Sequence, residues 1–124
     1  MRKYTESHEW ILIENEIATI GITQIAADEI GEIAYVALPE IGKVIHKDDI
    51  CAVVESSKAA IDIASPVSGE VVAVNKELMD TPERVNEAPE GEGWLYQIKL
   101  YNRDELLSYM DVKTYINKMK EISS

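Results

Sequence analysis

The chain has 124 residues, the length of one ordinary domain, which excludes a second domain of usual size. Of these residues 46% are hydrophobic and 28% charged, a composition that excludes an intrinsically disordered protein. Its 12 basic residues stand against 23 acidic ones, a net charge of -11, which argues against nucleic acid or an anionic membrane as a partner. Phenylalanine is absent and Cys51 is the only cysteine, so Ile, Val, Ala and Leu must build the core and no internal disulfide can form.

The N-terminal part of the chain predicts two short strands followed by a helix. Residues 9–22 partly alternate between apolar and polar side chains, with a polar break that indicates a turn at Asn15. Thr23 can cap a short helix near residues 24–30, and Gly31 supplies its C-terminal stop.

The middle of the chain is dense in short strands separated by turn residues such as Pro39, Gly42 and Gly69. Their spacing favours a small sandwich or barrel over alternating helices and strands. Residues 75–93 form a long polar connection, which we expect to be ordered by packing over the edge of a sheet. The predicted strands cover residues 33–38, 44–45, 50–55, 60–64, 70–74 and 94–100.

The last part of the chain, about 103–122, predicts two short amphipathic helices. Asn102 and Glu105 form a capping-box pattern before the first, and Asp111 precedes the apolar positions of the second. We expect the apolar stripe to pack on the chain's own sheet, although a partner protein is the alternative. The sequence therefore predicts one mainly β domain over residues 1–124.

The hairpin at about residues 50–65 carries the most informative chemistry. Two apolar strands flank a polar segment of small residues, which places Lys58 at the tip of the hairpin. An exposed lysine in a turn is usually a solvated charge. A long amine on a tight turn can also present a covalently attached group clear of the fold, and amidation would remove its positive charge.

Several segments together resemble the glycine cleavage H-protein family. Residues 55–60, with Asp62 and 65–71, look like the lipoylation hairpin of that family, with Lys58 at the modified position. The resemblance reaches from Tyr4 to about Leu100. Biotinyl domains place methionines beside the lysine, whereas Ser57 and Ala59 stand there in this chain. The further matching segments are 7–10, 18–23, 38–40, 85–86, Pro89 and 91–95.

The resemblance implies a barrel-sandwich hybrid of two antiparallel sheets that carries (R)-lipoic acid on Lys58 as N6-lipoyllysine. The arm would carry the aminomethyl group of glycine from a pyridoxal-phosphate-dependent glycine decarboxylase (P protein) to an aminomethyltransferase (T protein), and a dihydrolipoamide dehydrogenase (L protein) would reoxidise it. A lipoate ligase or a lipoyl/octanoyl transferase would attach the cofactor. The implied protein is a non-catalytic monomer whose lipoylation hairpin context is Glu55, Ser56, Ser57 and Ala59.

The resemblance also implies a cleft that shelters the loaded arm. The family positions of this cleft match Ser7, Glu9 and Asp62, and carboxylates suit an ammonium-like guest. The alternative for Glu9 and Asp62 is that they are ordinary acids of a strand or turn.

Two other functions remain open at this point. The first is a lipoate relay, which would donate the lipoyl group to E2 subunits of 2-oxoacid dehydrogenases. Ile61 leaves this function open, because the family usually has a small or polar residue at that position. Ser57 also departs from the family, which commonly has Val. The second of these functions is that of an unmodified scaffold that binds proteins through its acidic surface.

Metal, triad and targeting patterns find no support in the sequence. His8 and His46 are the only histidines, and no neighbouring pattern supplies a third metal ligand. Ser56, Ser57, His46 and Asp62 lack a nucleophile-elbow pattern. The first ten residues lack the apolar core of a signal peptide, and no apolar run approaches the roughly 18 to 20 residues that span a bilayer. We expect a cytoplasmic protein, with a processed mitochondrial form as the alternative.

Overall fold

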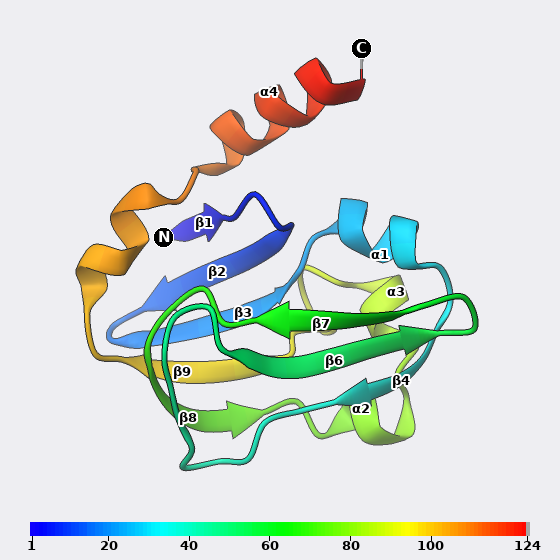
Figure 1. The fold of residues 1–124 in the computed structure, drawn as a ribbon, viewed down its shortest axis with the longest axis horizontal. Coiled ribbons are helices and arrows are strands. Elements are labelled where there is room, and N and C mark those ends of the chain that lie inside the picture. Colours follow the sequence, from blue (N-terminus) through cyan, green and yellow to red (C-terminus); the bar gives the residue numbers. More distant parts are fainter. Residues whose placement is uncertain (124) are drawn as a thin grey trace.

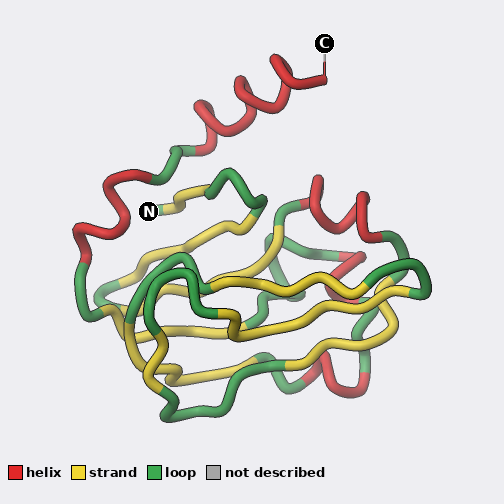
Figure 2. The backbone as a smooth tube through the Cα atoms, viewed as in Figure 1, coloured by secondary structure: helices red, strands yellow, loops and turns green. Residues whose placement is uncertain are grey.

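Two antiparallel sheets form the body of the protein in the computed structural model, which describes residues 1–123, with side chains up to residue 121. The six-stranded sheet has the order β1-β2-β3-β9-β8-β5, and the three-stranded sheet has the order β4-β6-β7 (Figures 1 and 2). The mainly β prediction with two antiparallel sheets is therefore confirmed. The strands are β1 (Arg2–Tyr4), β2 (Glu9–Glu14), β3 (Ile17–Ile22), β4 (Ile33–Ala37), β5 (Val44–Ile45), β6 (Ile50–Ser56), β7 (Ala60–Ala64), β8 (Gly69–Val74) and β9 (Tyr96–Leu100).

The core lies between the facing sides of the two sheets. Ile11, Ile20 and Ile98 are fully buried from the large sheet, while Val54 and Ile63 are buried from the small one. Alternate residues of a strand point to opposite faces, so the branched side chains of each strand gather on its inner face. Each such side chain contributes about 1.5–3 kcal/mol on burial.

Helix α1 (Gln24–Ile30) forms as its sequence predicts. The Thr23 hydroxyl accepts a hydrogen bond from the Ala26 N–H, which satisfies one of the free donors at the helix start. Gly31 ends the helix with a φ of 88°, a conformation that favours glycine.

The connection at residues 75–93 is ordered, and it contains two short helices that the sequence analysis does not predict. Helix α2 (Glu77–Asp80) and helix α3 (Arg84–Glu87) each have one buried side chain, Leu78 and Val85, and neither has a side-chain cap. Each helix has only four residues, with two apolar positions in α2 and one in α3, which is too few to show a helical period. Strand β1 is also absent from the prediction, since its three residues are too short to alternate.

The C-terminal part differs in detail from the predicted pair of α-helices. The first element, η1 (Arg103–Ser108), is a 3-10 helix. The Asn102 side chain caps it by accepting from the Asp104 N–H, but the Glu105 carboxylate accepts from the N–H and hydroxyl of Ser68 at 2.7 and 2.8 Å. The capping box is therefore only half formed, because Glu105 makes a tertiary contact.

The last helix, α4 (Val112–Ser123), extends away from the two sheets in Figure 1. The Asp111 carboxylate accepts from the Thr114 N–H at its start. Within residues 1–123, none of the helices combines the length and apolar character that crossing a bilayer requires.

The strand predicted at residues 94–100 begins two residues later, at Tyr96, because Trp94 belongs to a turn in which its N–H donates to the Gly91 carbonyl.

The thiol of Cys51 is half-buried, and burial raises its pKa to about 11. A thiol with that pKa is almost wholly protonated near neutrality and is therefore unreactive.

Candidate functional site

Lys58 lies at the apex of the hairpin that joins β6 to β7, as the sequence predicts. The two strands pair antiparallel through Val54 with Ile61 and through Glu55 with Ala60. The turn projects from the end of the molecule beyond β4 and α1 (Figure 1). The paired strands hold the base of the lysine, while its side chain is exposed.

The hydroxyl of Ser56 shapes the turn. Its Oγ accepts hydrogen bonds from the N–H groups of Lys58 at 3.2 Å and Ala59 at 3.3 Å, while the Ser56 N–H donates to the Ala59 carbonyl at 2.9 Å. A serine hydroxyl can replace a backbone acceptor in this way. Ser56 thus satisfies the main-chain donors of the apex without a glycine.

The environment of the Lys58 amine leaves it available for acylation. Among the residues that the structure describes, none forms an ion pair with Lys58. Its neighbours Ser57 and Ala59 are small and exposed, and Glu55 is half-buried beside Tyr35 of β4. Converting the amine to an amide would therefore break no ion pair within residues 1–121, so the residues present fit a lysine-linked group.

A cleft of about 320 Å³ lies at the other end of β7. Ser7, from the connection between β1 and β2, and Glu9, the first residue of β2, line it as the sequence predicts. Ala64 and Ser65, at the end of β7, form another wall. The cleft thus connects the N-terminal turn with the strand that leads away from Lys58.

Glu9 is the buried acid of this cleft, with 7% of its surface exposed. The Thr5 hydroxyl donates to the Glu9 carboxylate at 2.8 Å and accepts from the Glu9 N–H at 3.1 Å. Burial raises the pKa of the Glu9 carboxyl, and the hydrogen bond from Thr5 opposes this rise. A desolvated carboxylate gains more from a cationic guest than an exposed one does.

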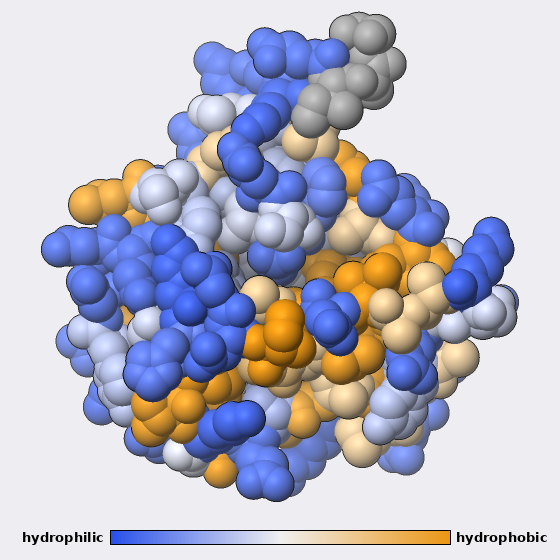
Figure 3. All heavy atoms as spheres, in the orientation of Figure 1, coloured by the Kyte–Doolittle hydropathy of each residue, from blue (hydrophilic) through white to orange (hydrophobic). Residues whose placement is uncertain are grey.

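Asp62 lies outside the cleft lining. It occupies the middle of β7, opposite Val53, and its side chain is exposed. The chain from Lys58 to Ala64 spans about 20 Å at about 3.3 Å per residue, so Asp62 stands between the hairpin tip and the cleft. Apolar side chains gather over β6 and β7 on this face (Figure 3), where Ile61 is 37% exposed.

The structure adds cleft residues that the sequence analysis missed. The Tyr109 hydroxyl donates to the Pro66 carbonyl at 2.6 Å, and the Lys47 ammonium lies 5.2 Å from the centre of the Tyr109 ring. Both residues line the cleft, together with Met110. In the sequence these residues belong only to a predicted turn and a predicted helix. Neither pattern indicates that they line the same cleft as Glu9.

His46 and Ser56, which the sequence analysis considered for other chemistry, make contacts within turns. The exposed His46 ring lies 3.6 Å from the carboxylate of Asp49, three residues further along the same turn. The Ser56 hydroxyl accepts hydrogen bonds within the hairpin turn. Within residues 1–123, no group of three or more potential metal ligands is close enough to hold an ion.

A barrel-sandwich fold of two antiparallel sheets, with a lysine at the apex of an exposed hairpin, defines the class of small carrier domains. The family model described as "Glycine cleavage H-protein" matches residues 2–122. The chain therefore belongs to the glycine cleavage H-protein family.

Individual relatives agree with this assignment. The chain is 52% identical to the glycine cleavage system H protein of Aeromonas salmonicida over 96% of this chain and 93% of that one. It is 44% identical to that of Thermotoga maritima, with 93% of each chain covered. A crystal structure of a glycine cleavage system H protein from Mycobacterium marinum superposes with a TM-score of 0.88 at 31% identity, covering 96% of both chains.

Family membership gives the chain the role of lipoyl carrier in the glycine cleavage system. This favours the predicted main function over the lipoate relay. As a carrier component of that system, it has the P, T and L proteins as its partners.

Proposed function

We propose that the lipoyl group is attached to Nζ of Lys58 as an amide. The observation that carries this proposal is the exposed amine at the apex of a rigid hairpin, with no ion pair to it among the described residues. When bound, (R)-lipoic acid supplies a dithiolane that accepts the aminomethyl group of glycine and later releases it. The chain's own contribution is to hold and orient the base of this arm.

Each residue around Lys58 has a role in this proposal. Ser56 holds the apex, whereas Ser57 and Ala59 leave room around the amine for the active site of a lipoate ligase or a lipoyl/octanoyl transferase. Glu55 supports recognition by that enzyme, since it is the charged side chain nearest to Lys58 in sequence.

The cleft shelters the loaded end of the arm. The Glu9 carboxylate and the Ser7 hydroxyl accept hydrogen bonds from an ammonium-like amine, and burial of Glu9 strengthens this attraction. Asp62 attracts the same amine on its way along β7. The walls reduce the access of water, which would hydrolyse the aminomethyl group.

The protein acts as a non-catalytic monomer of one domain over residues 1–124. The chemical steps belong to the glycine decarboxylase, the aminomethyltransferase and the dihydrolipoamide dehydrogenase, and a monomer leaves the hairpin free to enter each in turn. The relatives named above are bacterial, which supports a location in the cytoplasm rather than a processed mitochondrial form.

Exchange of bicarbonate into glycine by the decarboxylase tests this function. We expect Lys58→Arg to abolish the exchange, because arginine keeps the charge and length but is not acylated by the lipoyl-attaching enzyme. Lys76→Arg, a change at another exposed lysine, is the matched control and should retain full exchange. Exchange at the normal rate with Lys58→Arg would refute the proposal.

A further inference from the structure

The connection between β1 and β2, which presents Ser7 and Glu9 to the cleft, is a tight turn. The His8 N–H donates to the Thr5 carbonyl at 3.2 Å, and the Thr5 N–H donates to the Glu9 carbonyl at 3.0 Å. His8 has a φ of 67°, in the left-handed region that few residues other than glycine adopt. A side chain in this conformation needs surrounding contacts to hold it.

The contact that holds the His8 ring comes from the C-terminal helix. His8 Nδ1 lies 2.7 Å from the hydroxyl of Tyr115, which is 107 residues further along the chain. The two rings meet edge to face with their centres 5.8 Å apart. The His8 carbonyl also accepts from the Thr23 N–H at 2.9 Å, so both the ring and the main chain of His8 are held.

Tyr115 is well suited to act as this anchor. It is 4% exposed and is the only buried side chain of α4 among residues 112–121. Its ring stacks on Tyr4 with the centres 4.8 Å apart, and its hydroxyl lies 3.0 Å from the Thr23 hydroxyl. The attachment of α4 to the body is therefore concentrated on a residue that also contacts the cleft-bearing turn.

The donors and acceptors form a continuous chain. The Ala26 N–H donates to the Thr23 hydroxyl, which is then free to donate to the Tyr115 hydroxyl. The Tyr115 hydroxyl can then donate to His8 Nδ1, an arrangement that requires the His8 tautomer with its ring proton on Nε2. Each hydroxyl donates once and accepts at least once, an arrangement in which neighbouring hydrogen bonds strengthen one another.

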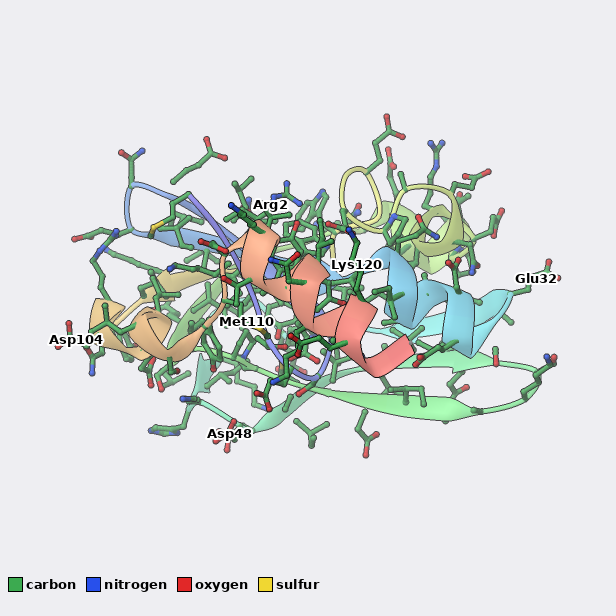
Figure 4. The ribbon with its side chains drawn as sticks, turned by 90° about the horizontal axis from the view of Figure 1, so that it is seen from above. Arg2, Glu32, Asp48, Asp104, Met110 and Lys120 are labelled. Atoms are coloured by element: carbon green, nitrogen blue, oxygen red, sulfur yellow. The ribbon has the colours of Figure 1, made fainter. Side chains whose placement is uncertain are left out.

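A second contact joins α4 to the same turn. Lys118, three residues after Tyr115, pairs with the Glu6 carboxylate, and Glu6 lines the cleft. Before the helix, Met110 and Tyr4 exchange backbone hydrogen bonds at 2.7 and 2.9 Å. Seen from above, α4 projects across the body of the molecule (Figure 4), and it contacts strand β1.

We propose that Tyr115 is a positioning residue of the carrier: through the His8 ring it fixes the turn that presents Ser7 and Glu9 to the loaded arm. This inference rests on the sheltering function proposed for the cleft. Tyr115 itself does not line that cleft, so its effect on the arm must pass through the turn.

The test uses full-length lipoylated protein loaded with the aminomethyl group, and measures the rate at which that group is lost in the absence of other enzymes. Tyr115→Phe keeps the ring stacked on Tyr4 but removes the hydroxyl. We expect the loss to become at least about threefold faster, approaching the rate of Glu9→Gln. Tyr101→Phe, at an exposed tyrosine, is the matched control and should lose the group at the same rate as the lipoylated protein without a substitution.

A spectroscopic readout separates positioning from general stability. In the unloaded protein, Tyr115→Phe should shift the carboxyl carbon resonance of Glu9 and increase amide exchange at Glu9 and Thr23, while lipoylation of Lys58, followed by intact mass, stays at the normal rate. His8→Gly accepts the left-handed backbone but lacks the ring, and should produce the same changes. Because both variants break one path, the double variant should add nothing further.

The outcomes distinguish the inference from the function on which it rests. If Glu9→Gln sheds the group quickly but Tyr115→Phe keeps it as long as the unmodified sequence, the positioning role is wrong and the cleft remains. If Glu9→Gln has no effect, the sheltering function fails and the inference fails with it. Additive effects of His8→Gly and Tyr115→Phe would also overturn the inference. Should Tyr115→Phe lose helical circular dichroism, His8→Gly carries the test, since it retains the stacking of Tyr115 on Tyr4.

Discussion

At the hairpin apex, a single hydroxyl takes the place of a special backbone conformation. Tight hairpin turns commonly use glycine or asparagine at positive φ, but none of residues 56–59 has a positive φ. The Ser56 Oγ accepts from two N–H groups instead. The residue that holds Lys58 in place is therefore two positions away from it.

Replacing Ser56 tests this local role. We expect Ser56→Ala to lower the free energy of unfolding by about 0.5–1 kcal/mol, because two main-chain donors lose their acceptor at an exposed site. Lipoylation of Lys58 should also become slower, since the apex is less fixed. Ser57→Ala changes the neighbouring exposed serine and should leave stability unchanged in denaturant unfolding; equal losses for both variants would contradict the role of Ser56.

Glu9 is expected to reduce stability near neutral pH. Burial raises its carboxyl pKa in the folded state above the ordinary value of 4.5, so as the pH rises from that value to the raised one, the unfolded chain releases its proton first and the free energy of unfolding falls. Glu9→Gln cannot ionise and keeps an acceptor for Thr5. We expect it to melt at a higher temperature than the unmodified sequence near neutral pH.

The pH dependence provides the control for this prediction. Below the ordinary carboxyl pKa of 4.5, Glu9 is protonated in both states and the advantage of Glu9→Gln should disappear. A variant that melts lower than the unmodified sequence at neutral pH would show that the Glu9 charge stabilises the fold, contrary to the burial argument.

At the scale of the elements, the β6–β7 hairpin was predictable from sequence because its information is local: two apolar runs flank a polar tip. Helices α2 and α3 and strand β1 were not, because each has only three or four residues and depends on packing for its stability. Only the Asn102 half of the predicted capping box forms, because the Glu105 carboxylate instead accepts a hydrogen bond from Ser68, in a distant part of the chain.

Strand pairing at Gly69 supplies a test of the packing between elements. A Cβ at this position would lie 2.0 Å from the Lys99 carbonyl oxygen, in the adjacent strand β9. We expect Gly69→Ala to lower the free energy of unfolding by about 2–4 kcal/mol, because backbone rather than a flexible side chain must move. At Gly91 the nearest atom would be 4.0 Å away, so Gly91→Ala should change stability by less than about 0.5 kcal/mol in the same denaturant experiment. Similar values for the two would contradict the close pairing of β8 with β9.

For the whole molecule, the two parts of the site differ in how far the sequence could predict them. Lys58 and its neighbours are contiguous, so the pattern and the family resemblance identify them directly. The cleft assembles Glu9, Lys47, Ser65 and Tyr109 from four separate segments. Ser7 and Glu9 were expected in the cleft only through the family resemblance. The contact between Tyr115 and His8 could not be predicted from a local pattern, because 107 residues separate the two.

The most direct test of the carrier function is the mass of the peptide that contains Lys58, isolated from the native host. Attachment of the lipoyl group through an amide adds roughly 188 Da, and fragmentation assigns the added mass to one residue. We predict that it resides on Lys58 and on no other lysine. Native protein whose Lys58 peptide is wholly unmodified, or whose lipoyl group sits on a different lysine, would contradict the account.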